Sequence, residues 1–391
     1  MGRGLPTMSR LAVTVLALAL AGLAGAADGR VVERPVVVHG CDGLYYEPPG
    51  RPQLLVVSDL PLEDSAHTAM RQMTQAVKLT LKDRGFRAGR FRVGYVVCDD
   101  SGPAGTWSAR RCMGNARAAA RNVDVVGVIG TLDSGCARVE LPVLGHAKIL
   151  LVSPLNTAVD LTRGHRGQIA RLSARDDLQA AAAARFFRRL GVRTVAALSD
   201  DTARGKAYRS QFVDAARGSG LRVVAHGRAD GAYVGGILGG RPRATLLAAR
   251  GRAPGGPIAL AAGYGPAAQL AAVAGGAAEG AYLFVAGVPD ERLGAPGRSF
   301  VRHFDSAIGT SPHPFAVYAA QAARLLLDAI ARSRGTRQSI GRAVLSTHES
   351  DGLIGLVSFD ANGDLRRPAV TIFRIHERSA KIVQVVRSGL P

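Results

Sequence analysis

Lysine and aromatic residues are scarce in this chain. Only five of the 50 basic residues are lysines, and aromatic residues make up 5% of the sequence. The arginines are scattered, with no run longer than a pair such as Arg188-Arg189, and no aromatic residues alternate with them as stacking platforms. These absences argue against nucleic acid as a partner, despite a net charge of +20. The charge indicates a solvated arginine-rich surface with mild attraction to anionic surfaces.

Catalytic and metal-binding signatures are also missing. The nine histidines form no H-E-x-x-H motif, no G-x-S-x-G motif occurs, and the cysteine spacing fits no zinc site. The G-x-G-x-x-A stretch at 263–268 imitates a dinucleotide fingerprint but lacks the acid expected after the next strand. The D-x-N-x-D stretch at 360–364 opens like a calcium loop, yet Leu365 and Thr371 stand where glycine and glutamate belong. We therefore expect no enzyme activity, no cofactor and no metal.

The first residues have the pattern of a secretory signal. Arg3 and Arg10 precede the apolar run Leu11–Leu23, which ends in the small residues Ala24–Ala27. The run is too short to span a membrane comfortably, and no later segment reaches the required length. We expect cleavage near Ala26 and an exported protein, periplasmic or extracellular and associated with the cell envelope. The nearest cysteine is too far downstream for lipid attachment at the cleavage point.

Four cysteines lie in the exported part of the chain. An even number in an oxidising compartment favours two disulfides, with three possible pairings. The four residues are Cys41, Cys98, Cys112 and Cys136.

Strand-like apolar runs alternate with helical patterns in two successive units. This β-α-β-α order predicts parallel sheets covered by helices on both faces. The first unit has strands at 54–57, 91–97, 123–129 and 149–152, and helices at 66–81, 115–122 and 138–145. The second has strands at 194–198, 221–225, 233–237 and 258–262, and helices at 207–217 and 244–252. Two helices at 299–308 and 315–333 follow, and then hairpin-like strands at 356–359, 370–375 and 382–386 with an Asn362-Gly363 turn.

Two motifs carry a resemblance to a known family. S-P-x-N-T-x-x-x-L-T at 153–162 follows a strand, and G-x-x-x-F-D-x-x-G-D at 355–364 lies near the end of the chain. Together with V-I-G-T-L-D-S-G-C at 128–136, they resemble type I periplasmic binding proteins, in particular the leucine/isoleucine/valine-binding receptors of ABC transporters. The resemblance covers roughly Leu54 to Val386. It implies two Rossmann-like α/β lobes with parallel sheets, joined by a three-stranded hinge.

The resemblance implies a domain organisation and a disulfide pattern. Both lobes are expected to be discontinuous, with crossings near Leu172, Val288 and His348. The family also implies a Cys112–Cys136 bridge at the edge of the first sheet, with Cys41–Cys98 as the second pair. The expected segments are 1–26 for the signal peptide, 27–52 for an N-terminal extension, 53–171 plus 288–348 for the N-terminal lobe, and 172–287 plus 349–391 for the C-terminal lobe.

The ligand is expected between the lobes, beyond the carboxyl ends of the strands. The hydroxyls of Ser134 and Thr157, together with free N–H groups at the start of the helix after Ser134, suit an anionic end of a ligand. Helix capping is the alternative role for both hydroxyls. The full set of ligand-binding residues implied for this site is Ser65, Ser134, Gly135, Leu155, Asn156, Thr157, Asp200, Arg204 and Tyr264.

The second lobe departs from the family pattern. Where the family has an acid that pairs with the ammonium of an amino acid, this chain has Tyr264 between two glycines, and the usual aromatic near Arg204 is missing. An unpaired ammonium in a closed site is costly. Either Asp200, Asp201 or Asp290 replaces the acid, or the ligand is a carboxylate, an amide or a peptide-like molecule. Tyr264 is the residue of this lobe that we expect to contact it.

These features predict a monomeric receptor that closes on a small ligand and delivers it to an ABC permease. A ligand sensor of the same fold, signalling to a membrane partner, is the alternative. An exported α/β hydrolase is a third hypothesis, but it needs a nucleophile and a base that the sequence does not display.

Overall fold

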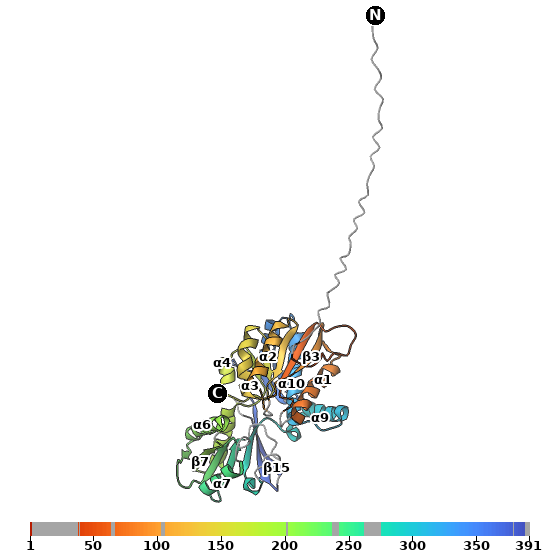
Figure 1. Cartoon of the computed structure of the whole chain (residues 1–391). Coiled ribbons are helices and arrows are strands. Elements are labelled where there is room, and N and C mark those ends of the chain that lie inside the picture. Colours follow the sequence, from red (N-terminus) through yellow and green to blue (C-terminus); the bar gives the residue numbers. More distant parts are fainter. Residues whose placement is uncertain are drawn as a thin grey trace. The chain divides into compact units, whose positions relative to one another are not determined.

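Two sheets flanked by helices form the described body of the chain, shown in Figure 1 by their labelled elements. The structure is a computed structural model. It describes Met1, Val38 and residues 40–63, 67–102, 106–200, 202–236, 242–261, 275–377 and 379–387.

The first sheet has six strands in the order β2-β3-β1-β4-β5-β6. All neighbours pair in parallel except β2, which joins β3 in an antiparallel turn at the edge. The central strands are buried on both faces, as continuous Val/Ile/Leu runs require. The strands are β1 (Leu54–Leu60), β2 (Arg87–Ala88), β3 (Phe91–Asp99), β4 (Val125–Gly130), β5 (Leu150–Ser153) and β6 (Ile169–Arg171).

Helices from two distant parts of the sequence cover this sheet. The apolar helix α10 packs against both α1 and β4, and a Cβ at Gly127 would lie 2.7 Å from a Leu326 methyl carbon, so a larger residue there would require the Leu326 side chain to shift. We call the first sheet with these helices the first lobe. Its helices are α1 (His67–Asp83), α2 (Ala109–Arg121), α3 (Ser134–His146), α4 (Asp160–Gly164), α9 (Ala295–Ile308), α10 (Pro314–Ala331) and α11 (Arg337–Leu345).

The second sheet has seven strands in the order β15-β14-β11-β10-β9-β7-β8. Strands β7 to β11 run parallel to one another, and β14 and β15 add an antiparallel edge. We call this sheet with its helices the second lobe. Its core includes the stacked rings of Phe212 and Tyr233, with centroids 3.8 Å apart. The elements are β7 (Thr194–Ser199), β8 (Arg222–Val223), β9 (Gly231–Gly235), β10 (Ile258–Ala261), β11 (Tyr282–Ala286), β14 (Ala369–His376), β15 (Ser379–Arg387), α5 (Asp176–Arg189), α6 (Ala203–Gly218) and α7 (Pro242–Arg252).

The chain passes between the two sheets near residues 171–176, again near 286–289, and finally before β14. The hairpin of β12 (His348–Gly352) and β13 (Gly355–Ser358) packs into the first lobe, where Gln321 of α10 donates to Glu349 and accepts from the backbone N–H of Leu353. The lobe boundaries stay a prediction, and these contacts favour a third crossing nearer Ala369 than His348.

Both predicted disulfides, Cys41–Cys98 and Cys112–Cys136, are present in the structure and confirm the expected pairing. The first bridge attaches the N-terminal extension to the outer edge of β3. There, Tyr45 and Tyr95 exchange backbone hydrogen bonds of 2.8 and 3.1 Å. The extension therefore covers an edge strand that would otherwise expose unpaired backbone groups.

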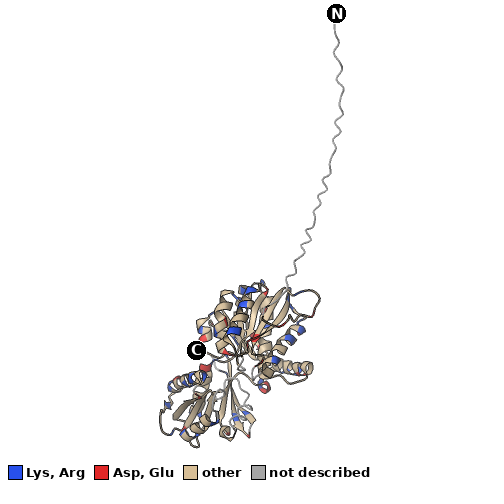
Figure 2. Cartoon of the chain, viewed as in Figure 1, with Lys and Arg blue, Asp and Glu red and all other residues tan. Residues whose placement is uncertain are grey.

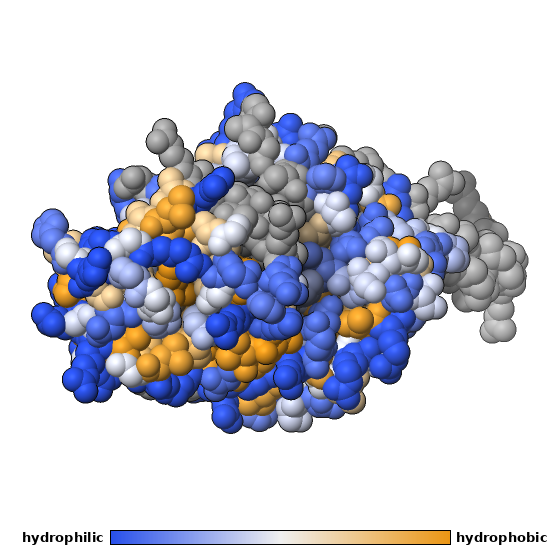
Figure 3. Space-filling view, turned by 90° about the horizontal axis from the view of Figure 1, so that it is seen from below, coloured by the Kyte–Doolittle hydropathy of each residue, from blue (hydrophilic) through white to orange (hydrophobic). Residues whose placement is uncertain are grey.

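The charged residues are distributed over both lobes. In Figure 2, lysine and arginine occur on several helices and strands of each lobe, as the scattered arginines of the sequence predict. On the face shown in Figure 3, hydrophobic residues form separate patches between hydrophilic side chains. In the described part of the chain, no helix combines the length and apolar character needed to cross a membrane.

The sequence reading missed or misplaced several elements. Helices α4, α5 and α11 and strands β6 and β12 were not predicted. The expected Asn362-Gly363 turn closes a short antiparallel bridge between Phe359 and Leu365, but the strands on either side pair elsewhere: β13 pairs with β12, and β14 pairs with β11 and β15. The turn also places Asp364 beside β6, where it forms a single bridge with Arg171.

Candidate ligand-binding site

The side chain of Asn156 connects two loops at the carboxyl ends of β4 and β5. Its amide nitrogen donates to the backbone oxygens of Thr131 and Leu132, at 3.1 and 3.3 Å, and its oxygen accepts from the Ser153 hydroxyl at 2.8 Å. Asn156 is fully buried. In this structure it holds the loops in place, and its predicted contact with a ligand is untested.

Helix α3 begins at the loop after β4. Asp133 caps the helix by accepting from the Gly135 N–H at 2.6 Å, and the Ser134 hydroxyl accepts from the Ala158 N–H at 3.3 Å. A Cβ on Gly135 would collide with the ring of Trp107, so glycine is required where this ring covers the helix start. Helix α3 therefore begins at Ser134, which is buried between the two loops, and anion binding at this helix start stays a prediction.

Thr157 lies where the first lobe meets the helices of the second. It is fully buried, and its carbonyl accepts from the Asp176 N–H at the start of α5, at 2.9 Å. Burial raises the pKa of the Asp176 carboxyl, and a hydrogen bond from Thr157 opposes that shift. Burial also raises the pKa of the nearby Tyr208 hydroxyl to about 12. Arg204 of α6 lies 5.9 Å from the centre of the Tyr208 ring, and its Nη1 is 3.8 Å from Oδ2 of Asp133.

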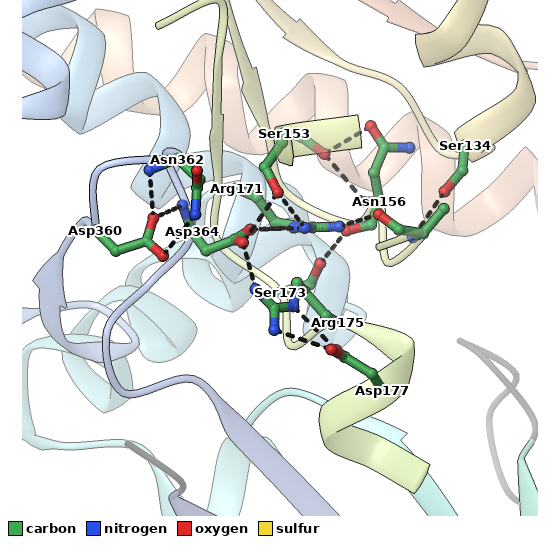
Figure 4. A network of polar contacts seen from close by, with 12 residues as sticks. Ser134, Ser153, Asn156, Arg171, Ser173, Arg175, Asp177, Asp360, Asn362 and Asp364 are labelled. Carbon is green, nitrogen blue, oxygen red and sulfur yellow. Dashed lines mark hydrogen bonds and ion pairs between the residues drawn. The ribbon is translucent and has the colours of Figure 1, made fainter. Parts of the chain in front are cut away.

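A buried ionic network connects β6, α5 and the turn before β14 (Figure 4). Asp364 accepts from Arg171 at 2.6 and 2.8 Å, from Arg175 at 2.9 Å and from the Thr162 hydroxyl at 2.9 Å. Arg175 also forms a two-point pair with Asp177. The Arg171 side chain is completely buried. Removing one partner of such a network leaves uncompensated buried charge, so the network fixes how the segment between the sheets is held.

One cavity of about 190 Å³ lies between the described segments of the two lobes. Its walls come from the end of β5, the strand β11 and the residues after it, the start of α10, and β14. The lining is mostly apolar, so it suits an apolar ligand body. The lining residues are Pro154, Leu155, Ser173, Val285, Ala286, Gly287, Val288, Pro289, His313, Pro314, Phe315, Tyr318, Thr371 and Phe373.

One polar residue of the cavity wall, His313, was not predicted from the sequence. Burial lowers the pKa of His313 to about 4, so its ring is neutral at pH 7, and its Nδ1 accepts from the Phe315 N–H at 3.3 Å. Asp290, one of the three candidates to replace the family's acid, directly follows the lining residue Pro289, and burial with the charge of Glu291 raises its pKa to about 6. The His-Pro pair at the start of α10 is a capping pattern visible in the sequence, but nothing in the sequence places it opposite β5.

The predicted site residues fall into four groups. Ser134, Gly135, Asn156 and Thr157 come together at the β4 and β5 loops, and Arg204 faces them from α6. Leu155 is the one predicted residue that lines the cavity. Oδ1 of Asp200 accepts at 2.6 Å from the hydroxyl of Thr202, the residue that caps α6, and its Oδ2 is buried with no hydrogen-bond partner in the described part of the chain. Ser65 and Tyr264, together with Asp201, lie outside the described residues.

A second buried cluster lies behind this site in the first lobe. The carboxyl groups of Asp59, Asp100 and Glu140 are buried beside the sulfur of Cys136, which lies 3.2 Å from an Asp100 oxygen. Burial, together with the charge of Asp59, raises the pKa of Glu140 well above its ordinary value. These groups lie close enough together to surround an ion, but the cysteine sulfurs are joined in the disulfide and are not thiolate ligands.

Two α/β lobes with a cavity between them and polar loops at the strand ends define a class of two-lobed ligand-binding proteins. A periplasmic binding protein family model matches residues 61–380. The chain therefore belongs to the periplasmic binding protein family, which confirms the recognition made from its motifs and the predicted fold class.

Solved structures of similar fold include three with a named ligand or substrate class. The leucine-binding protein LivK of Thermotoga maritima is 21% identical, with 85% of this chain and 98% of that chain covered and a TM-score of 0.70. LivJ of Streptococcus pneumoniae, a branched-chain amino acid transporter substrate-binding protein in complex with isoleucine, is 15% identical, with 86% and 100% covered and a TM-score of 0.70. A solute-binding protein of R. palustris in complex with benzoate is 17% identical, with 86% and 97% covered and a TM-score of 0.67. A search of curated proteins finds no match.

Proposed function

We propose that this chain is an exported solute receptor that encloses a small ligand between its lobes and delivers it to an ABC permease. One observation carries the proposal: an apolar cavity has walls from both lobes, including Pro154 and Leu155 of the loop after β5. A cavity built in this way changes shape when the lobes move, so a ligand that fills it favours one arrangement of the lobes.

The composition of the site favours a ligand with an apolar body and one strongly accepting end. Leu155 in the cavity wall and Thr157 belong to the same loop after β5, which supports placing the apolar body of the ligand near these polar groups. The start of α3 offers backbone N–H groups and a positive dipole end, which favour a carboxylate. One structure of similar fold holds isoleucine, and another holds benzoate, an aromatic carboxylate. Both ligands combine an apolar body with a carboxylate.

A binding screen on the exported protein tests the proposal. Small carboxylates, amino acids, amides and short peptides are added singly, and the melting temperature is recorded, because a ligand that binds only the folded state raises it. Ala286→Phe places a large ring in the cavity wall and should abolish the shift. The control Leu247→Phe adds the same ring on α7, where the wild-type leucine is 52% exposed, and should retain it.

The screen also has a result that contradicts the proposal. A ligand whose thermal shift is the same in Ala286→Phe and in the wild type binds elsewhere, and the cavity is then not the binding site. Melting of both variants without ligand shows whether either substitution disturbs the fold itself.

A further inference from the structure

Arg204 forms a charged contact between the two lobes. It extends from the first turn of α6 in the second lobe, and its Nη1 is 3.8 Å from Oδ2 of Asp133 at the start of α3 in the first lobe. Both side chains are partly exposed, 44% for Arg204 and 30% for Asp133. An ion pair between partly exposed groups contributes little to stability. Arg204 can therefore exchange Asp133 for a stronger partner at a small cost in free energy.

The other oxygen of Asp133 is already engaged. Oδ1 accepts from the Gly135 N–H at 2.6 Å, so Asp133 caps α3 whether or not it contacts Arg204. On the opposite side, Arg204 lies over the Tyr208 ring at 5.9 Å. Asp176 is also near, but burial raises its pKa, which weakens it as a competing anion. Arg204 therefore faces the first lobe while its guanidinium lies over the Tyr208 ring of the second lobe.

Two acids in the described part of this corner are already engaged. Asp133 is shared between the α3 cap and Arg204, and Asp176 is buried next to Thr157. Asp200 accepts from Thr202 through Oδ1, whereas its Oδ2 is buried with no hydrogen-bond partner among the described residues, as is Oδ1 of Asp290. The group of the second lobe that faces the α3 start is nevertheless the cation of Arg204. A guanidinium repels an ammonium and pairs with a carboxylate through two parallel hydrogen bonds.

We propose that Arg204 selects ligands that carry a carboxylate and lack an α-ammonium, and that Asp133 occupies it when no ligand is bound. The inference rests on the proposed function and deepens it. On binding, the ligand carboxylate meets the start of α3 and the hydroxyls of Ser134 and Thr157 from one lobe, and Arg204 from the other. Asp133 gives up its contact with Arg204 and keeps the α3 cap. The ligand is then an apolar or aromatic monocarboxylate whose body extends toward Leu155 and the cavity.

The fluorescence of a tryptophan near the start of α3 can report the binding of a ligand carboxylate. Trp107 is its single tryptophan, and the ring lies against Gly135 in the first turn of α3. A ligand carboxylate at the helix start should therefore change the tryptophan emission. Three probes differ at one end only: 4-methylpentanoate carries the carboxylate, leucine adds the α-ammonium, and 4-methylpentanamide replaces the carboxylate by a neutral amide.

The test is a set of fluorescence titrations of the full exported protein with these probes. The wild type should bind 4-methylpentanoate at least about tenfold more tightly than leucine or the amide. Arg204→Gln should lose about 10- to 100-fold in affinity for 4-methylpentanoate, because one charge-assisted bond is removed. It should lose little for the amide. Asp133→Asn, which retains an oxygen for the α3 cap, should bind 4-methylpentanoate several-fold more tightly because the competitor of the ligand is gone. Arg217→Gln at the far end of α6 is the matched control and should bind like the wild type.

Two results overturn this inference while leaving the receptor function intact. One is tighter binding of leucine than of 4-methylpentanoate by the wild type. The other is equal affinity of Arg204→Gln and Arg217→Gln for 4-methylpentanoate. Failure of the proposed function has a different signature, since no compound of the thermal-shift screen would then depend on Ala286. Urea unfolding of each variant without ligand separates loss of binding from loss of fold.

Discussion

The two lobes share an architecture but have different interiors. The first lobe contains both disulfides and most of the buried polar groups, including Asp59, Asp100, Glu140 and Asn156. In the second lobe, among the described residues between Ala180 and Ala286, no serine, threonine, asparagine, glutamine or charged residue is buried. Apart from Asp176 and Gln179 of α5 and Thr371 of β14, the described buried side chains of this lobe are alanine, aliphatic and aromatic. The difference shows that directional bonds fix the lobe whose loops present hydroxyls and N–H groups, while the other lobe is held by packing.

The largest loss of stability is expected when the buried ionic network between the sheets is disrupted. Asp364→Ala leaves Arg171 and Arg175 without their shared buried acceptor, and should lower the free energy of unfolding by about 3–5 kcal/mol. Urea unfolding measures the change. Asp177→Ala is the control, because the Asp177 side chain is 32% exposed and contacts Arg175 alone, so its loss should be much smaller. An equal decrease in the free energy of unfolding of the two variants would show that burial of the network does not contribute to stability.

Disulfide reduction should affect the lobes unequally. The bridges join residues 57 and 24 apart in sequence, and removing either should destabilise the protein by about 2–4 kcal/mol, because the unfolded chain gains freedom. Hydrogen exchange after reduction should accelerate in β3, α2 and α3, while β7, β9 and β10 keep their protection. The paired variants Cys41→Ser/Cys98→Ser and Cys112→Ser/Cys136→Ser separate the two bridges. Equal acceleration in both lobes would show that the lobes unfold as one unit.

A smaller effect concerns the pH dependence of the first lobe. Burial, with the charge of Asp59, raises the pKa of Glu140 above its ordinary value of 4.5. The folded state therefore binds more protons than the unfolded state above pH 4.5, and stability falls as the pH rises from there toward the folded pKa. Glu140→Gln cannot ionise and should be more stable than the wild type at pH 8, with little difference at pH 4. The increase should be smaller than the loss from removing either disulfide.

The matched control for this pH profile lies in the second lobe. Glu279 is exposed, and its hydrogen bond with His376 lowers its pKa, so its contribution is lost on acidification and has the opposite sign. Glu279→Gln should leave the slope between pH 5 and pH 8 unchanged. A wild-type stability that is flat over this range would mean that Glu140 is not held protonated by its surroundings. Guanidinium unfolding at each pH provides the comparison.

The sequence predicted the fold better than the site. Continuous apolar runs such as those of β4 and β5 are specified locally, and the motifs at 153–162 and 355–364 together identified the family. The cavity depends on pairing between segments far apart in the chain, such as Leu155 with His313 and Phe373, for which no local pattern exists. Helix α5 was missed because five consecutive alanines blur its periodicity. The roles of Asn156 and Asp200 became visible only when their hydrogen-bond partners were known.

The bridge between Cys41 and Cys98 means that the covalent attachment of the N-terminal extension depends on the redox state of the compartment. In a reducing cytosol this sulfur bond does not form, and backbone hydrogen bonds of Tyr45 with Tyr95 and of Asp42 with Val97 still hold the extension at β3. The rings of Tyr45 and Tyr46 also pack against Phe86. For a protein exported as proposed, oxidation after export therefore adds a covalent link to a sheet edge that these contacts already cover.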